Sequence, residues 1–149
     1  MSLEDLYRQV ILDHYRSPRN QGHIEGCDVH GEGQNPLCGD EILLDLAITD
    51  DTVTDVAITG QGCSISQASA SMMSEAIKGK TLIEVDDLIH RFKTMMDVEQ
   101  GDDGLDPARP GAVLGDLEAL QGVRKFPVRI KCASLPWTTL EQALATRES

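Results

Sequence analysis

Residues 41–60 have the sequence EILLDLAITDDTVTDVAITG, two alternating apolar runs separated by a pair of aspartates. Period-two alternation over residues 41–48 and 53–59 is typical of strands with one buried face. Asp50-Asp51 supplies a short turn, and two strands joined by so short a link are antiparallel. The alternating apolar positions are Ile42, Leu44, Leu46 and Ile48 in the first run and Val56 and Ile58 in the second. The stretch therefore predicts a β-hairpin, with Asp45 on the face opposite its apolar side chains.

The part of the chain before this hairpin predicts one helix and little else. Apolar residues recur at helical spacing over residues 2–15. The turn-forming run 16–22, which contains Pro and Gly, ends this helix. Residues 23–37 are polar and Gly-rich, and we expect one short edge strand there, over residues 27–31.

Two further helices are expected directly after the hairpin. Beyond Cys63 the apolar period changes from two to that of a helix, and Gly79 closes this segment. Thr81 then caps a second helix, and Glu84, three residues on, completes a capping box. The apolar face of this second helix is made by Leu82, Val85, Leu88, Ile89, Phe92 and Met96.

The C-terminal third combines a loop with short elements. Residues 100–111 are rich in Gly, Pro and Asp and predict a loop, and residues 114–120 predict a short helix. We expect a short extended run over residues 127–130. A last helix then begins at a Ser134 cap, with Pro136 in its first turn. The sequence shows no internal repeat and predicts a single domain over residues 1–149.

Composition and charge exclude several classes of partner. The chain of 149 residues is 40% hydrophobic and 26% charged, which is the range of ordinary globular domains. Its net charge of -12 argues against binding to nucleic acid or to anionic lipid, since both need clustered Lys and Arg. No apolar stretch is long enough to span a bilayer, and the N-terminus lacks a signal pattern. We therefore expect a cytoplasmic protein, whose cysteines bind metal or catalyse rather than form disulfides.

Three of the four cysteines stand in Gly-, Pro- or polar-flanked settings, and together they suggest a metal site. The settings are Asn35-Pro36-Leu37-Cys38-Gly39-Asp40, Gly60-Gln61-Gly62-Cys63-Ser64 and Lys131-Cys132-Ala133-Ser134. Asp40 adds a carboxylate, so the candidate metal ligands are Cys38, Asp40, Cys63 and Cys132. Three soft sulfurs and one hard oxygen suit zinc, or an iron–sulfur cluster with labile ligation. No C-x-x-C motif is present, which argues against a zinc finger or a disulfide oxidoreductase.

The local settings predict different roles for the three thiols. Cys63 and Cys132 are each expected immediately before a helix. The unpaired N–H groups and the dipole at a helix start lower the pKa of a thiol there. Cys38 lies on a turn in which Gly39 permits a tight bend. We therefore expect Cys63 and Cys132 to be the steadier ligands and Cys38 to be the one that moves.

Two residues near these thiols are left with open interpretations. Cys27 has no glycine frame and is interpreted as a small buried hydrophobic residue, with a stray ligand role beside His23 or His30 as the alternative. Arg129 precedes Cys132 by three positions, and strand alternation places it on the opposite face from that cysteine. It pairs with an anion of the site or stays solvated, and the sequence leaves both open.

Four motifs in this order resemble the IscU/NifU N-terminal family of iron–sulfur cluster assembly proteins. The motifs are Asp13-His14-Tyr15-x-x-Pro18-Arg19-Asn20-x-Gly22, Asn35-Pro36-x-Cys38-Gly39-Asp40, Gly60-x-Gly62-Cys63 and Cys132-Ala133-Ser134. The resemblance runs from about residue 3 to residue 146. It implies an α+β fold in which helices pack on one side of a small antiparallel sheet of about three strands. It also implies that Cys38, Asp40, Cys63 and Cys132 are the ligands of a metal or cluster.

Departures from the IscU pattern favour one branch of this family. Lys131 stands where IscU-type scaffolds have a histidine, and residues 125–129 are Lys-Phe-Pro-Val-Arg instead of a Leu-Pro-Pro-Val-Lys chaperone motif. An insertion is expected around residues 95–115. These features, with an arginine three residues before the last cysteine, resemble the SufU branch. That branch is associated with zinc and with accepting sulfur from a cysteine desulfurase.

The resemblance therefore implies a zinc-bound sulfur acceptor that acts with a SufS-like cysteine desulfurase. In this hypothesis Cys38 is the catalytic residue that receives persulfide sulfur. The alternative is a scaffold that holds iron or a [2Fe–2S] cluster on the same residues and hands it to apo iron–sulfur acceptor proteins. A third interpretation is an interaction domain with a purely structural zinc.

Overall fold

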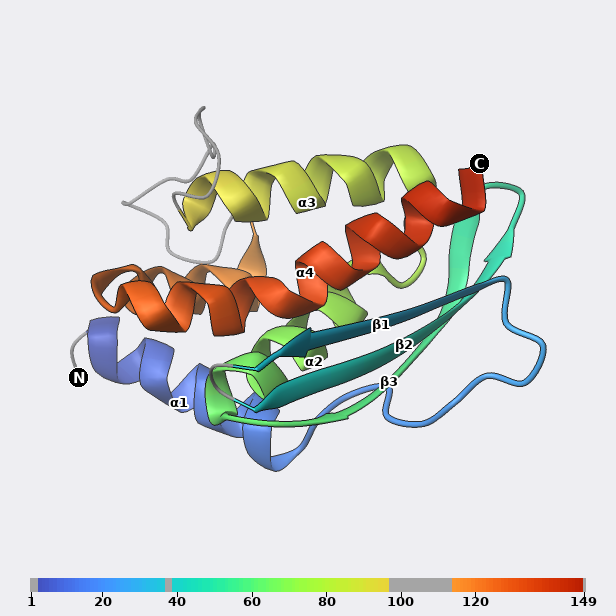
Figure 1. Cartoon of the computed structure of the whole chain (residues 1–149). Helices are drawn as coiled ribbons and strands as arrows, with labels where there is room; N and C mark the ends of the chain where they lie inside the picture. The colour runs from blue at the N-terminus through green and yellow to red at the C-terminus, as the bar shows by residue number, and fades with distance from the viewer. Residues whose placement is uncertain (1–2, 37–38, 97–113, 149) are drawn as a thin grey trace.

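The computed structural model describes residues 3–36, 39–96 and 114–148, and these form a three-stranded sheet covered by helices (Figure 1). The expected α+β fold, with helices on one side of a small antiparallel sheet, is confirmed. In chain order the elements are α1 (Leu3–Arg16), β1 (Val29–Asn35), β2 (Asp40–Thr49), β3 (Thr52–Gln61), α2 (Ser64–Ile77), α3 (Leu82–Met95), the 3₁₀ helix η1 (Gly115–Lys125) and α4 (Pro127–Glu148).

The hairpin predicted from residues 41–60 is confirmed as β2 and β3. The two strands pair antiparallel, with Leu44 opposite Ile58. Asp50 and Asp51 both adopt positive φ angles, of 52° and 59°, which give the turn a twist that matches the strands it joins. β2 is also the central strand, since the sheet order is β1-β2-β3.

The edge strand β1 lies further along the chain than the sequence suggested. We expected it over residues 27–31, whereas it spans Val29–Asn35 and pairs antiparallel with β2. Its glycines explain the difference, because Gly31 and Gly33 face α4. A Cβ at Gly31 would clash with the Ala143 side chain, and a Cβ at Gly33 with the Thr139 side chain. Glycine usually weakens a strand, but here it permits β1 to pack closely against a helix.

The first three helices follow the predictions closely. α1, α2 and α3 occupy the expected segments, and Thr81 and Glu84 form both hydrogen bonds of the predicted capping box, each at 3.2 Å. The short helix expected over residues 114–120 is a 3₁₀ helix that continues to Lys125. The loop expected over residues 100–111 lies outside the described residues.

The last helix begins earlier than predicted, and this correction affects the site. Pro127 is the first residue of α4, so the extended run expected over 127–130 is wrong, and so is the Ser134 cap. Proline is well suited to a first helical position because its missing N–H has no partner there. Pro136 therefore lies inside the helix and not in its first turn. The helix is held there by packing against the core of the side chains Ile130, Ala133, Trp137 and Leu140, which recur at helical spacing.

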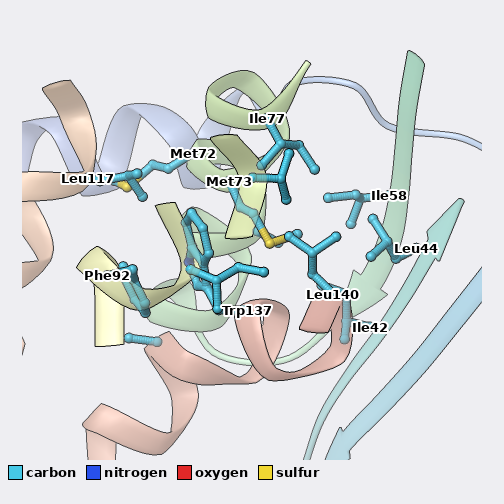
Figure 2. Close-up of a cluster of buried hydrophobic side chains, with 14 of the residues drawn as sticks. Ile42, Leu44, Ile58, Met72, Met73, Ile77, Phe92, Leu117, Trp137 and Leu140 are labelled. Carbon is cyan, nitrogen blue, oxygen red and sulfur yellow. The ribbon is translucent and has the colours of Figure 1, made fainter. Parts of the chain in front are cut away.

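One buried cluster joins the sheet to the helices (Figure 2). α4 packs on β1 and β2, α2 packs on β3, and α1 lies against α2. Phe92 of α3 stacks on Trp137 of α4, with ring centroids 4.6 Å apart. The side chains labelled in Figure 2 are Ile42, Leu44 and Ile58 from the sheet, Met72, Met73 and Ile77 from α2, Leu117 from η1, and Phe92, Trp137 and Leu140. None of the helices in the described ranges is long and apolar enough to cross a membrane.

Candidate metal centre

Asp40, Cys63 and Cys132 come from three separate elements and meet at one end of the sheet. Asp40 begins β2, Cys63 follows β3 directly before α2, and Cys132 lies in α4. One donor atom from each residue lies within 4.8 Å of the other two. The structure therefore brings together three of the four predicted ligands. The fourth, Cys38, lies outside the described residues.

Asp40 is a buried carboxylate held in place by backbone. Asp40 is only 1% exposed. Oδ1 accepts a hydrogen bond from the Cys63 N–H at 2.8 Å, and Oδ2 lies 3.9 Å from the Cys63 Sγ. Gly62 makes this approach possible, because its φ is +145° and a Cβ there would clash with the Asp40 carboxylate. The second glycine of the Gly-x-Gly-Cys motif is thus required sterically, since any side chain there would clash with Asp40.

Cys63 occupies the position that the sequence predicted, at the start of a helix. It is the N-cap residue of α2, with φ −72° and ψ 164°, and its side chain makes no capping hydrogen bond. Its half-buried sulfur stays available to other partners. Negative charge at this position is stabilised by the positive end of the helix dipole.

Cys132 does not lie at a helix start, so that prediction is wrong. It sits in the second turn of α4, which already begins at Pro127, and it is fully buried. Its sulfur lies 3.9 Å from the Asn35 side-chain amide and 3.9 Å from the Val128 carbonyl oxygen. Stabilisation of a Cys132 thiolate therefore comes from neighbouring side chains and not from a helix N-terminus.

Arg129 lies on the same face of α4 as Cys132, because residues three apart on a helix are neighbours. The expectation of opposite faces rested on an extended segment and is wrong. Arg129 hydrogen-bonds to the sulfurs of both Cys63 and Cys132. The pKa of Arg129 is raised above its ordinary value, first by the charge of Cys63 and then by the hydrogen bond to Cys132. Of the two interpretations left open, pairing with the anions of the site is the one found.

The donor set fits a thiophilic divalent cation such as zinc. Two thiols and a carboxylate converge, two of the three residues are almost fully buried, and an arginine offsets part of their charge. Zinc takes sulfur and carboxylate ligands in four-coordinate sites. Burying such a group of anions without a cation is costly, so the arrangement favours an ion at this place.

A groove beside the centre was not predicted from the sequence. It has a volume of about 950 Å³, and Cys63 and Arg129 belong to its wall. Phe126 and Val128, 62% and 63% exposed, contribute apolar side chains to it. The described wall carries three cations, Arg8, Lys125 and Arg129, and no Asp or Glu. The sequence signal for this groove is the run Lys125–Arg129, in which two cations flank apolar residues.

Comparison with known proteins places the fold and these residues in one family. The sequence matches the family described as NifU-like N terminal domain over residues 6–133. It is 48% identical over 147 residues to the zinc-dependent sulfurtransferase SufU of Bacillus subtilis, covering 99% of this chain and 95% of that protein. It is 40% identical over 142 residues to the iron–sulfur cluster assembly scaffold protein IscU of Streptococcus pyogenes, covering 95% of this chain and 84% of the other.

A solved structure agrees over the whole fold. The crystal structure of an iron–sulfur cluster assembly scaffold protein for the SUF system from Fervidobacterium islandicum superposes with a TM-score of 0.82 at 36% identity. The match covers 96% of this chain and 99% of that one. The resemblance seen in the four sequence motifs is confirmed: this chain belongs to the NifU-like N-terminal domain family.

Proposed function

We propose that this protein is a zinc-bound sulfur acceptor in iron–sulfur cluster assembly, taking persulfide sulfur from a cysteine desulfurase on Cys38. The observation that carries the proposal is the convergence of Asp40, Cys63 and Cys132 within 4.8 Å, with Arg129 on both sulfurs. The high identity to a zinc-dependent sulfurtransferase supports the same function. The cytoplasm is the proposed compartment, because this chemistry needs reduced thiols.

The proposed ligands are Cys38, Asp40, Cys63 and Cys132. When bound, zinc acts as a Lewis acid that favours the deprotonated form of the thiols it contacts. Asp40 is fixed by the Cys63 N–H, and Cys132 is fixed within α4. Asp40, Cys63 and Cys132 hold their positions through secondary structure, which leaves Cys38 as the ligand proposed to exchange.

The proposed reaction is a transfer of sulfane sulfur between two cysteines. The Cys38 thiolate attacks the terminal sulfur of the desulfurase persulfide, and a new S–S bond forms on Cys38. The S–S bond on the desulfurase breaks, and its electron pair leaves with the desulfurase cysteine as a thiolate. The proton of the terminal sulfur stays on that sulfur. No external oxidant or reductant is needed, since one persulfide replaces another.

Arg129 is proposed to hold the remaining thiolates while Cys38 reacts. Its guanidinium hydrogen-bonds to Cys63 and Cys132, so it offers positive charge to both sulfurs when one ligand is withdrawn. Arg129 is therefore a positioning residue for the two fixed sulfurs.

The groove beside the centre is the proposed approach for the persulfide-bearing segment of the desulfurase. Its exposed Phe126 and Val128 offer apolar contact area next to Cys63. Its cations attract an anionic segment, although the chain as a whole carries a net charge of -12. A persulfide-bearing segment with apolar and acidic side chains combines both properties.

The test of this function is transfer of radiolabelled sulfur from a cysteine desulfurase. Cys38→Ser should abolish labelling while circular dichroism shows a folded protein. Cys27→Ser, which removes a cysteine outside this centre, should be labelled like the wild type. Labelling that survives in Cys38→Ser would overturn the role given to Cys38.

A second candidate function is a scaffold for a [2Fe–2S] cluster on the same residues. It is favoured by the 40% identity to an IscU scaffold protein. Elemental mass spectrometry of the purified, untreated protein separates the two candidates. Zinc without iron supports the sulfur acceptor, whereas iron with acid-labile sulfide supports the scaffold and its apo acceptor partners.

A further inference from the structure

A second group of potential ligands lies on the other face of the sheet. Asp45 is five residues along β2 from Asp40, which at the rise of a strand is roughly 17 Å. Because side chains alternate along a strand, Asp45 and Asp40 point to opposite faces. The group around Asp45 is therefore separate from the proposed zinc centre.

Asp45 is surrounded by sulfur and nitrogen donors. His30 lies directly opposite it in the β1–β2 register, and the His30 Nδ1 is 2.6 Å from the Asp45 Oδ1. The His23 Nδ1 is 3.6 Å from Oδ2, and Cys27 hydrogen-bonds to the same carboxylate. Donor atoms of Cys27, His30 and Asp45 all lie within 4.8 Å of one another.

The position of the carboxylate is fixed by the fold. Asp45 is 5% exposed although it lies on the face away from the main core. Its Oδ2 accepts a hydrogen bond from the Ile24 N–H at 3.0 Å, which ties the segment before β1 to the sheet. Gly26, with φ +67°, makes the turn that leads from Ile24 to Cys27. The buried Asp45 carboxylate thus faces the Cys27 thiol and the His23 imidazole from the segment before β1. It also faces the His30 imidazole from β1.

We infer that Cys27, His30 and Asp45, with His23 as the fourth ligand, form a second divalent metal site that takes zinc. One thiolate, two imidazoles and one carboxylate are all ligands that zinc accepts, and four of them complete a tetrahedral site. At the usual zinc bond lengths, neighbouring ligand atoms are roughly 3.5 Å apart. The His30 and Asp45 atoms therefore separate by about 1 Å on binding, a change that side-chain rotation supplies.

A metal-free role for the same residues is the competing explanation. In that case the His30–Asp45 pair and the Ile24 hydrogen bond only fasten the segment before β1 to the sheet. Cys27 and His23 would then have no part, because neither is needed for that fastening. The two explanations differ in their prediction for variants of Cys27 and His23.

The experiment is a zinc titration of the metal-free wild-type chain, followed by elemental mass spectrometry after gel filtration. We expect two zinc ions per chain in the wild type and one in Cys27→Ala. His23→Ala removes a side chain that is 64% exposed, so the variant should fold like the wild type. We expect the zinc affinity of its second site to be at least tenfold lower. His90→Ala, which removes a half-exposed histidine of α3, is the matched control and should keep two.

The readout separates this site from the sulfur-acceptor centre. Cys63→Ser should lose the zinc of the sulfur-acceptor centre and keep the zinc of the second site. Cobalt bound to the second site of this variant should show the absorption of a single thiolate ligand. Adding Cys27→Ala should remove that absorption. Sulfur acceptance by Cys27→Ala should equal that of the wild type. One zinc per chain in the wild type, unchanged by Cys27→Ala and His23→Ala, overturns the second site whatever happens at the first.

Discussion

The Asp40 carboxylate accepts a hydrogen bond from the backbone N–H of Cys63 at 2.8 Å, so a ligand of the proposed zinc centre is oriented by the backbone of another ligand. This contact joins the start of β2 to the start of α2. A change that pushes the two apart disturbs a carboxylate and a thiol together. The geometry of the centre therefore depends on what occupies the position before Cys63.

Gly62→Ala tests that dependence. The Gly62 backbone has φ +145°, and the added Cβ would clash with Asp40. The variant therefore suffers backbone strain and a displaced Asp40 carboxylate. We expect it to be less stable by about 1–3 kcal/mol and to bind zinc more weakly. Urea unfolding and a zinc competition assay measure the two effects.

Gly122→Ala is the matched control for that substitution. A Cβ at Gly122 meets no atom within 4 Å, and no positive φ is involved. Its stability should equal or slightly exceed that of the wild type, because alanine restricts the unfolded chain. Equal zinc affinity in Gly62→Ala and wild type would contradict the steric account of the Gly-x-Gly-Cys motif.

Removal of zinc should lower the thermal stability of the protein. A ligand that binds only the folded state adds about 2.7 kcal/mol when its free concentration is 100-fold above Kd. We expect chelation to lower the midpoint of thermal unfolding of Cys27→Ala, a background chosen to isolate the first centre, and zinc to restore it. In Asp40→Asn the shift on adding zinc should shrink markedly. An identical shift in both proteins would show that Asp40 is not a ligand.

Replacement of Arg129 should weaken the centre in an order set first by charge and then by hydrogen-bonding geometry. Arg129→Gln removes the charge that faces two sulfurs, whereas Arg129→Lys keeps the charge and loses the two-pronged donor. We expect the initial rate of sulfur acceptance to fall in both, and further in Arg129→Gln. Arg91→Gln, which breaks an exposed ion pair with Asp87 on α3, should leave the rate unchanged. A wild-type rate in Arg129→Gln would remove Arg129 from the proposed function.

Phe126→Ala tests the groove as the docking place of the desulfurase. Phe126 is 62% exposed, so its loss should change folding stability little while removing contact area beside Cys63. We expect a higher concentration of the protein to be needed for half-maximal sulfur acceptance, with the maximal rate retained. Ile83→Ala, at an apolar residue 84% exposed on α3, is the control. The same shift in both variants would place the docking surface elsewhere.

Much of the fold and three proposed ligands of the centre were accessible from the sequence, because their signals are local. The Asp50-Asp51 turn and the Thr81–Glu84 capping box each depend on a few consecutive residues. Cys63 at a helix start followed from the change of apolar period around it. These patterns act over one turn or one hairpin, and tertiary packing did not override them.

The start of α4 was misassigned because two local patterns competed. Val128 and Ile130 alternate like a short strand, and Pro136 suggested a new first turn. The helix forms from Pro127 because Ile130 and Trp137 pack into the core, a gain that only the assembled fold provides. That error carried over to Cys132 and to the face assigned to Arg129.

By itself the sequence determined the hairpin, the Thr81–Glu84 capping box and the types of donor atom at the centre, since side-chain period, turn chemistry and donor atoms are properties of neighbouring residues. Only the tertiary structure decided that Arg129 faces Cys63 and Cys132, and that His30 and Cys27 meet Asp45. These contacts depend on where α4 begins and on the register of β1 against β2. Both depend on the packing of α4 against the core and against β1, segments that lie far apart in the chain, and no local pattern encodes this packing.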